Sequence, residues 1–117
     1  MRRQRQDEIR QYIKSDEVNK SILHERQAWH DRDSGHYKKG RSYLLPGVDA
    51  QELVDRYHGT GHAPITAKGW NGKEVVIADT DIGVDIDPST NKETITNRFV
   101  IHYRRTGTHV VPTNRSE

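Results

Sequence analysis

The chain contains no cysteine. This excludes disulfide bonds, thiolate metal sites and cysteine nucleophiles, and it suits a protein that must cross compartments or unfold without depending on redox state. Apolar residues are also scarce, at 31% of 117 residues, with a single phenylalanine and a single methionine. We therefore expect one domain with a modest core, a large polar surface and a monomeric state when unbound.

No apolar run approaches the length that spans a membrane, and the basic start after Met1 lacks the apolar stretch of a signal peptide. The net charge of +2 is small, although the pI near 9.0 is basic, so charge alone is a weak indication of a polyanionic partner. Seven histidines are the more notable feature, because imidazole is the side chain that titrates near neutral pH.

The first half of the chain has the patterns of helices. Residues 2–14 are weakly amphipathic and predict a helix, which we interpret as a linker or N-terminal arm over residues 1–15 ahead of a domain at 16–117. Ser15 is a candidate N-cap for a second helix over about 16–30. Asp49 and Glu52 form a variant capping box for a third helix, with Gly59 as its C-terminal stop.

The second half has the patterns of strands. Residues 75–79 and 82–87 predict a hairpin about Thr80-Asp81, and residues 94–112 predict two strands joined at Thr106-Gly107. We therefore expect about four antiparallel strands in a meander after two or three helices, which is an α+β domain.

The last predicted hairpin has two different faces. The apolar residues recur at period two, the signature of a half-buried strand, and they are Ile95, Phe99, Ile101 and Tyr103. A two-residue loop at Thr106-Gly107 would place Arg104 opposite His109, and residues directly opposite share a face. The other face would then carry threonine hydroxyls, guanidinium groups and imidazoles, from Thr96, Arg98, His102, Arg104 and His109.

These side chains match the needs of metal-free RNA cleavage. A base must remove the 2′-hydroxyl proton, an acid must protonate the leaving oxygen, and cations must stabilise the charge on phosphorus. The polar loop at 31–42 could add contacts to the RNA, with Lys38 and Arg41 on phosphates and Tyr37 stacked on a base. The opposing interpretation is that the polar side chains simply form the solvent-exposed face of a sheet and have no catalytic role.

Two other constellations are weaker. The aspartates at 79, 81, 85 and 87 could bind Mg²⁺ or Ca²⁺, but their spacing matches no calcium loop. His58 and His62 have the spacing of helical metal ligands, but Gly59 and Gly61 argue against a helix there. We expect no metal site and no cofactor from either.

Several short motifs, in their order, resemble the polymorphic toxin type 50 family, also called the bacterial toxin 50 domain. They are Gln27-Ala28-Trp29-His30, Gly40-Arg41-Ser42-Tyr43-Leu44, Gln51 to Gly61, Ile82-Gly83-Val84, Thr96-Asn97-Arg98-Phe99, Ile101-His102-Tyr103 and Gly107 to Pro112. The similarity spans roughly residues 18–112. The order of the motifs is more specific than any one of them.

The resemblance implies an RNase toxin at the C-terminus of a larger secreted, contact-dependent or phage-head-associated protein, acting in the cytoplasm of a target cell and countered by a cognate immunity protein. It implies the fold shared by barnase, EndoU, colicin E5 and RelE (the BECR fold), with N-terminal helices packed on a four-stranded antiparallel sheet. The catalytic candidates are His30, Ser42, His102, Arg104, Thr108 and His109. The candidates for substrate binding are Tyr37, Lys38, Arg41, Thr96, Arg98 and Tyr103.

Within this set, His30 and one of His102 or His109 would form the base and acid pair. Arg104 or Arg41 would stabilise the phosphorane, while Ser42 and Thr108 would donate hydrogen bonds to phosphate oxygens. The alternative is a non-catalytic module that binds nucleic acid or protein, and a third hypothesis is a metal-dependent nuclease that uses the aspartates.

Overall fold

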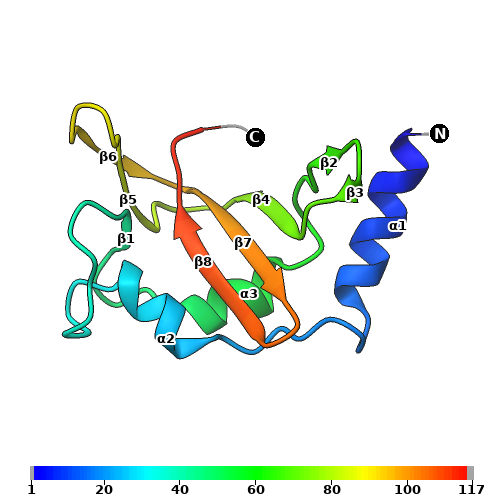
Figure 1. Cartoon of the computed structure of the whole chain (residues 1–117), viewed down its shortest axis with the longest axis horizontal. Helices are drawn as coiled ribbons and strands as arrows, with labels where there is room; N and C mark the ends of the chain where they lie inside the picture. Colours follow the sequence, from blue (N-terminus) through cyan, green and yellow to red (C-terminus); the bar gives the residue numbers. More distant parts are fainter. Residues whose placement is uncertain (1, 116–117) are drawn as a thin grey trace.

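The structure is a computed structural model that describes residues 2–115. Helices lead and most strands follow, which confirms the α+β class (Figure 1). The helical elements are α1 (Arg2–Lys14), α2 (His24–Gln27), the 3₁₀ turn η1 (Ala28–His30) and α3 (Ala50–Tyr57). The strands are β1 (Tyr43–Leu44), β2 (Ile65–Thr66), β3 (Gly69–Trp70), β4 (Lys73–Ile77), β5 (Gly83–Ile86), β6 (Glu93–Thr96), β7 (Arg98–Arg104) and β8 (Gly107–Pro112).

The helix expected over residues 16–30 is mostly wrong. Only α2 and η1 are helical in this range, because the preceding residues pair with β8 instead. The Leu23 amide donates to the Thr108 carbonyl at 2.8 Å, and the Thr108 amide donates to the Ser21 carbonyl at 2.9 Å. Ile22 is buried at this bridge, so tertiary pairing outweighs the local helical preference.

The prediction of α3 is confirmed. The Asp49 side chain accepts a hydrogen bond from the Gln51 amide, as an N-cap does. Leu53 and Val54 are buried on one face of the helix, and Gly59 follows its end with a positive φ of 77°.

The strands form three antiparallel sheets rather than one four-stranded sheet, in the orders β4-β7-β8, β1-β5-β6 and β2-β3. The expected hairpin between residues 75–79 and 82–87 is wrong, because β4 pairs with β7 and β5 pairs with β6. β6 leads directly into β7 at Asn97, so one long segment carries both larger sheets (Figure 1). Ala78 and Ile82 donate their amides to this segment between the two pairings.

This pairing decides which residues enter the core. Val76 lies opposite Phe99 and both are buried, whereas Ile77 is 60% exposed and Ile95 is 62% exposed. The core face of β4-β7-β8 packs against α3, with Ile101 and Val110 fully buried. Because side chains alternate across a strand, the intervening residues lie on the face turned away from α3.

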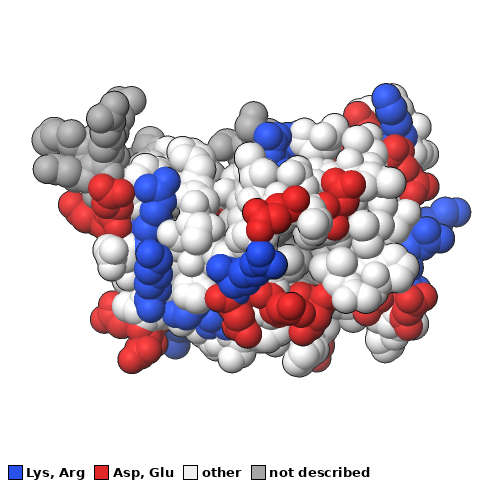
Figure 2. Space-filling view, turned by 180° about the vertical axis from the view of Figure 1, so that it is seen from behind, with Lys and Arg blue, Asp and Glu red and all other residues white. Residues whose placement is uncertain are grey.

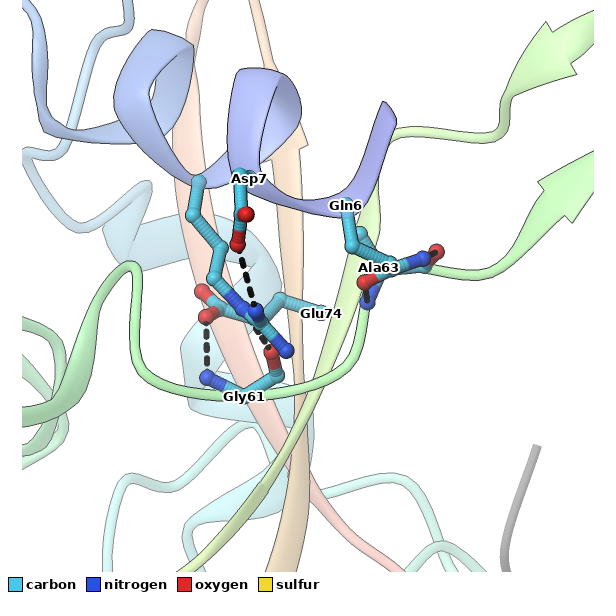
Figure 3. A network of polar contacts seen from close by, with 6 residues as sticks. Gln6, Asp7, Gly61, Ala63 and Glu74 are labelled. Carbon is cyan, nitrogen blue, oxygen red and sulfur yellow. Dashed lines mark hydrogen bonds and ion pairs between the residues drawn. The ribbon is translucent and has the colours of Figure 1, made fainter. Parts of the chain in front are cut away.

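Helix α1 packs on the loop that follows α3 (Figure 3). Its Ile13 is fully buried. The Gln6 amide group both donates to the Ala63 carbonyl at 2.6 Å and accepts from the Ala63 amide at 3.1 Å. Arg10 Nε donates to the Gly61 carbonyl at 2.8 Å. These polar contacts hold α1 against the loop, while Ile13 joins the hydrophobic core.

The same loop is tied to the sheet by the fully buried carboxylate of Glu74. It accepts hydrogen bonds from the amides of Gly59 at 3.1 Å and Gly61 at 2.7 Å, and from the Tyr103 hydroxyl at 2.7 Å. Three donors thus satisfy buried carboxyl oxygens, which would be costly to leave without hydrogen bonds. Tyr103, a candidate for substrate binding, therefore has its hydroxyl committed to the core.

Candidate active site

Three imidazoles stack in a row on the face of the sheet turned away from α3. His102 of β7 lies opposite His109 of β8, and their ring centroids are 4.5 Å apart with an angle of 13° between the planes. His30 of η1 continues the row, with its centroid 6.0 Å from that of His109 and an angle of 16°. We call these residues the histidine row. It joins side chains from two adjacent strands and one distant helical turn.

The β7–β8 register that forms the row differs from the expected one by two residues. Arg104 pairs with Gly107 and His102 pairs with His109, so the loop is Arg105-Thr106. Gly107 lies in β8 and packs on the chain before α2, where a Cβ would approach the Ser21 carbonyl oxygen to 3.0 Å. Since a shift of two residues keeps every side chain on its face, the predicted polar face survives the error.

His30 reaches the row because α2 is fastened along the outer edge of β8. The buried Gln27 side chain accepts a hydrogen bond from the Val110 amide at 2.7 Å and donates to its carbonyl at 2.9 Å. It thus stands in for a backbone partner at the sheet edge. Sequence reasoning gave Gln27 no role, because a glutamine that completes a distant strand has no local pattern.

The His30 ring is oriented by the backbone of Ser42. His30 Nδ1 lies 2.8 Å from the Ser42 carbonyl oxygen, and since a carbonyl can only accept, Nδ1 carries the proton. Burial lowers the pKa of His30, and the hydrogen bond to Ser42 partly opposes this effect. The ring is therefore neutral at pH 7, with the lone pair on Nε2 available as a base.

Burial also keeps the other two rings neutral. It lowers the pKa of His102 to about 4, aided by the charge of Lys73, and the pKa of His109 to about 3, aided by the neighbouring His102. His109 Nδ1 is the one buried side-chain nitrogen or oxygen without a hydrogen bond in the described chain. An unprotonated nitrogen tolerates this isolation better than an N–H group would.

The fixed charges that act on the row are all cationic. They belong to Arg26, Arg41, Lys73 and Arg104. Lys73 lies opposite His102 in the β4–β7 pairing and extends the row by one strand. The opposite side of the molecule, by contrast, carries interspersed acidic and basic side chains (Figure 2). The three neutral imidazoles are thus surrounded by positively charged side chains, and this positive potential favours the binding of an anion.

Lys73 and Arg26 were both absent from the sequence-based set. Lys73 joins the row only through the long-range pairing of β4 with β7, and Arg26 only through the docking of α2 on β8. Neither contact follows from a local pattern in the sequence.

The two expected catalytic hydroxyl residues, Ser42 and Thr108, do not belong to the row; each contacts the backbone or the ring of one of its histidines. Thr108 is fully buried on the core face of β8, and its hydroxyl donates to the His102 carbonyl at 2.8 Å. Ser42 is also buried, and its carbonyl fixes His30. Both contacts involve the backbone that carries or orients a histidine.

The expected substrate-binding residues divide into two groups. Lys38 and Arg41 surround the ring of Trp29 next to His30, and the Tyr37 hydroxyl donates to the Arg41 carbonyl. Arg98 shares the face of His102 but pairs with Ile77 at the other end of β7. Thr96 lies away from the row: its buried hydroxyl donates to the Thr113 carbonyl at 2.9 Å.

No group of three or more His, Asp or Glu side chains in the described residues is placed to hold a metal ion. The histidine row itself stacks ring on ring, so the rings face one another instead of directing their nitrogens at a common point. Asp79 pairs with Arg56 at 2.8 Å. Nor does any described helix have the length and apolar character to cross a membrane.

A pocket lies apart from the row. It has a volume of about 900 Å³ and opens between the α2–η1 segment and residues 43–51, where Ala28, Asp31, Leu44 and Val48 are among its lining residues. His102 and His109 do not line it. The titratable groups and the cations converge at the row and not at this pocket.

Comparison with known proteins assigns the chain to a family. No curated protein matches it. The family model described as Bacterial toxin 50 matches residues 22–112 of the 117-residue chain. This range holds the bridge to β8, η1, α3 and all three histidines of the row, and it begins after α1. The chain belongs to the Bacterial toxin 50 family.

Proposed function

We propose that this toxin domain is a metal-independent endoribonuclease that cleaves RNA through the 2′-hydroxyl. The observation that carries the proposal is the histidine row, which sets neutral imidazoles side by side among cations. Base, acid and charge stabilisation are the three requirements of this reaction, and the row with its flanking cations supplies all three.

His30 acts as the base. Its Nδ1 proton is committed to the Ser42 carbonyl, so the Nε2 lone pair takes the proton of the 2′-hydroxyl. The 2′-oxygen attacks phosphorus, the bond from phosphorus to the 5′-oxygen breaks, and the products are a 2′,3′-cyclic phosphate and a 5′-hydroxyl.

His102 acts as the acid that protonates the leaving 5′-oxygen. It is the most exposed ring of the row, while His109 separates it from His30. A phosphate anion bound over the row favours the imidazolium form and raises the pKa of His102, so the acid gains its proton when substrate is present. Arg104 and Lys73, two of the cations that act on His102, stabilise the phosphorane.

The test is incubation of purified protein with total RNA in EDTA, followed by analysis of the fragment ends. We expect discrete fragments with cyclic phosphate at the 3′ end. Cleavage that needs added Mg²⁺ would refute the mechanism and direct attention to the aspartates. Salt-sensitive RNA binding without cleavage would favour the alternative, a binding module.

The family context supports the remaining parts of the proposal. A toxin that cleaves RNA acts in the cytoplasm of the target cell, as the delivered C-terminal effector of a larger protein, and the producing cell needs a cognate immunity protein. We propose that this partner covers the histidine row. Co-expression with the cognate gene should suppress cleavage, and His102, the most exposed ring of the row, should become protected from carbethoxylation in the complex.

A further inference from the structure

A second group of cations lies at the His30 end of the row, gathered about one indole ring. Lys38 Nζ is 3.4 Å from the ring centroid of Trp29, Arg26 Cζ is 4.5 Å away and Arg41 Cζ is 6.0 Å away. We call Arg26, Trp29, Lys38 and Arg41 the indole cluster. Trp29 directly precedes His30 in η1, so the cluster borders the proposed base.

The loop that carries two of these cations is folded back onto η1 and fixed there. The Lys38 amide donates to the Trp29 carbonyl at 3.2 Å, and the Arg41 amide donates to the Lys38 carbonyl at 3.0 Å. The Ser34 hydroxyl donates to the Ala28 carbonyl at 2.8 Å. The cationic heads are therefore held near one place before any ligand arrives, which reduces the entropy lost on binding.

Three like charges about one ring repel one another, and a bound anion would relieve this repulsion. The ion pairs within the described residues are Arg10–Asp7 and Arg56–Asp79, so no carboxylate there neutralises the cluster. Cation–π contacts hold the heads in place. With Lys38 at van der Waals distance over the ring, the indole serves to position cations rather than to stack on a base.

The proposed function supplies an anion of the right kind. We infer that the indole cluster is a phosphate-binding subsite for the nucleotide next to the cleavage site, so that the RNA backbone lies along the histidine row and crosses the strands of the sheet. Lys73 borders the row at His102 and the cluster borders it at His30. A polyanion lying along the row therefore meets cations at both ends. This inference rests on the proposed function.

The first test compares two substrates: a dinucleotide with only the cleavable phosphate, and the same dinucleotide with a phosphate added at each end. The wild-type protein should prefer the extended substrate in kcat/KM. The double variant Arg26→Gln/Lys38→Gln should lose at least about tenfold of this preference, because charge-assisted bonds to phosphate are among the strong ones. Lys68→Gln, an exposed lysine in the β2–β3 turn, should keep it.

A second test needs no cleavage. Binding of a short RNA with a 2′-deoxy residue at the cleavage site is measured against salt concentration, and each lost phosphate contact should lower the slope of log K by about 0.7. An unchanged preference and an unchanged slope in the double variant would overturn the subsite. So would equal losses on both substrates, since the cluster would then act only on His30. Absence of cleavage by the wild type, with the slope still reduced, would instead overturn the proposed function alone.

Discussion

The histidine row makes the stability of this domain depend on pH in a direction that can be worked out. In the unfolded chain these imidazoles have their ordinary pKa of 6.5, whereas burial lowers the pKa of His102 to about 4 and that of His109 to about 3. Between these values the unfolded chain binds more protons than the folded one. The free energy of unfolding therefore falls as the pH falls through this window and is fully retained above pH 6.5.

The size of the effect follows from the same values. Between pH 7 and pH 5, protonation linked to His109 should lower the free energy of unfolding by about 2 kcal/mol. His102 should cost less, because one side of its ring reaches solvent. The window ends at pH 5 because carboxylates begin to titrate below it.

The informative variant is His109→Phe. Phenylalanine keeps an aromatic ring between His30 and His102, and it loses no hydrogen bond at Nδ1 because that atom has none. The free energy of unfolding is measured at pH 7, 6 and 5 by urea unfolding followed by far-UV circular dichroism. Between pH 7 and pH 5 it should decrease by about 2 kcal/mol less in the variant than in the wild type. His36→Ala, which removes an exposed histidine of the loop, should keep the wild-type fall. An identical decrease in the free energy of unfolding in the wild type and in His109→Phe would refute the description of the row as a buried stack of neutral rings.

Further predictions concern the reaction and the supports of the row. His30→Ala should lower RNA cleavage by about 10²–10⁴-fold when it is assayed at a temperature where the variant is still folded, because it also removes a buried, hydrogen-bonded ring; His62→Ala, at an exposed position, should cleave normally. The profile of kcat/KM against pH should peak below pH 6.5, because the free protein holds both its acid and its base with lowered pKa values; a maximum above pH 7.5 would contradict this. Lys73→Gln should slow single-turnover cleavage and shift the acidic limb of that profile upward, since a cation beside the acid is lost. Gln27→Leu should lower the free energy of unfolding by about 1–3 kcal/mol, because the Val110 amide loses its partner, and a stable, fully active variant would show that α2 docks without it.

Much of the candidate site could be predicted from the sequence, because it depends on local alternation of side chains along a strand. The β7 pattern alone puts His102 and Arg104 on one face and Phe99 and Ile101 on the other, and the structure agrees. The two-residue error in the position of the turn did not change which side chains share a face, because a shift by an even number of residues keeps each side chain on the same face. Thr96 was misplaced because the chain bends at Asn97, which separates β6 from β7 and breaks the count of two.

What could not be predicted depends on pairing between distant segments. The β4–β7 pairing replaces the local hairpin and brings Lys73 to His102. The bridge at Ile22 stops a helix that the local sequence favours and lets Gln27 complete β8. A single sequence carries no direct signal for such contacts, because each partner satisfies only hydrogen-bonding groups of a segment far along the chain.

The position of β7 has a consequence for how the domain opens. It is the central strand of β4-β7-β8, paired along both edges, and its alternate side chains form the core. Its amides should exchange with deuterium only when the whole domain unfolds, while those of the first turns of α1, held by contacts such as Gln6 to Ala63, should exchange through local opening. His102 is thus carried by the part of the molecule that opens last, so the β7–β8 part of the histidine row should remain folded when the preceding helix α1 detaches.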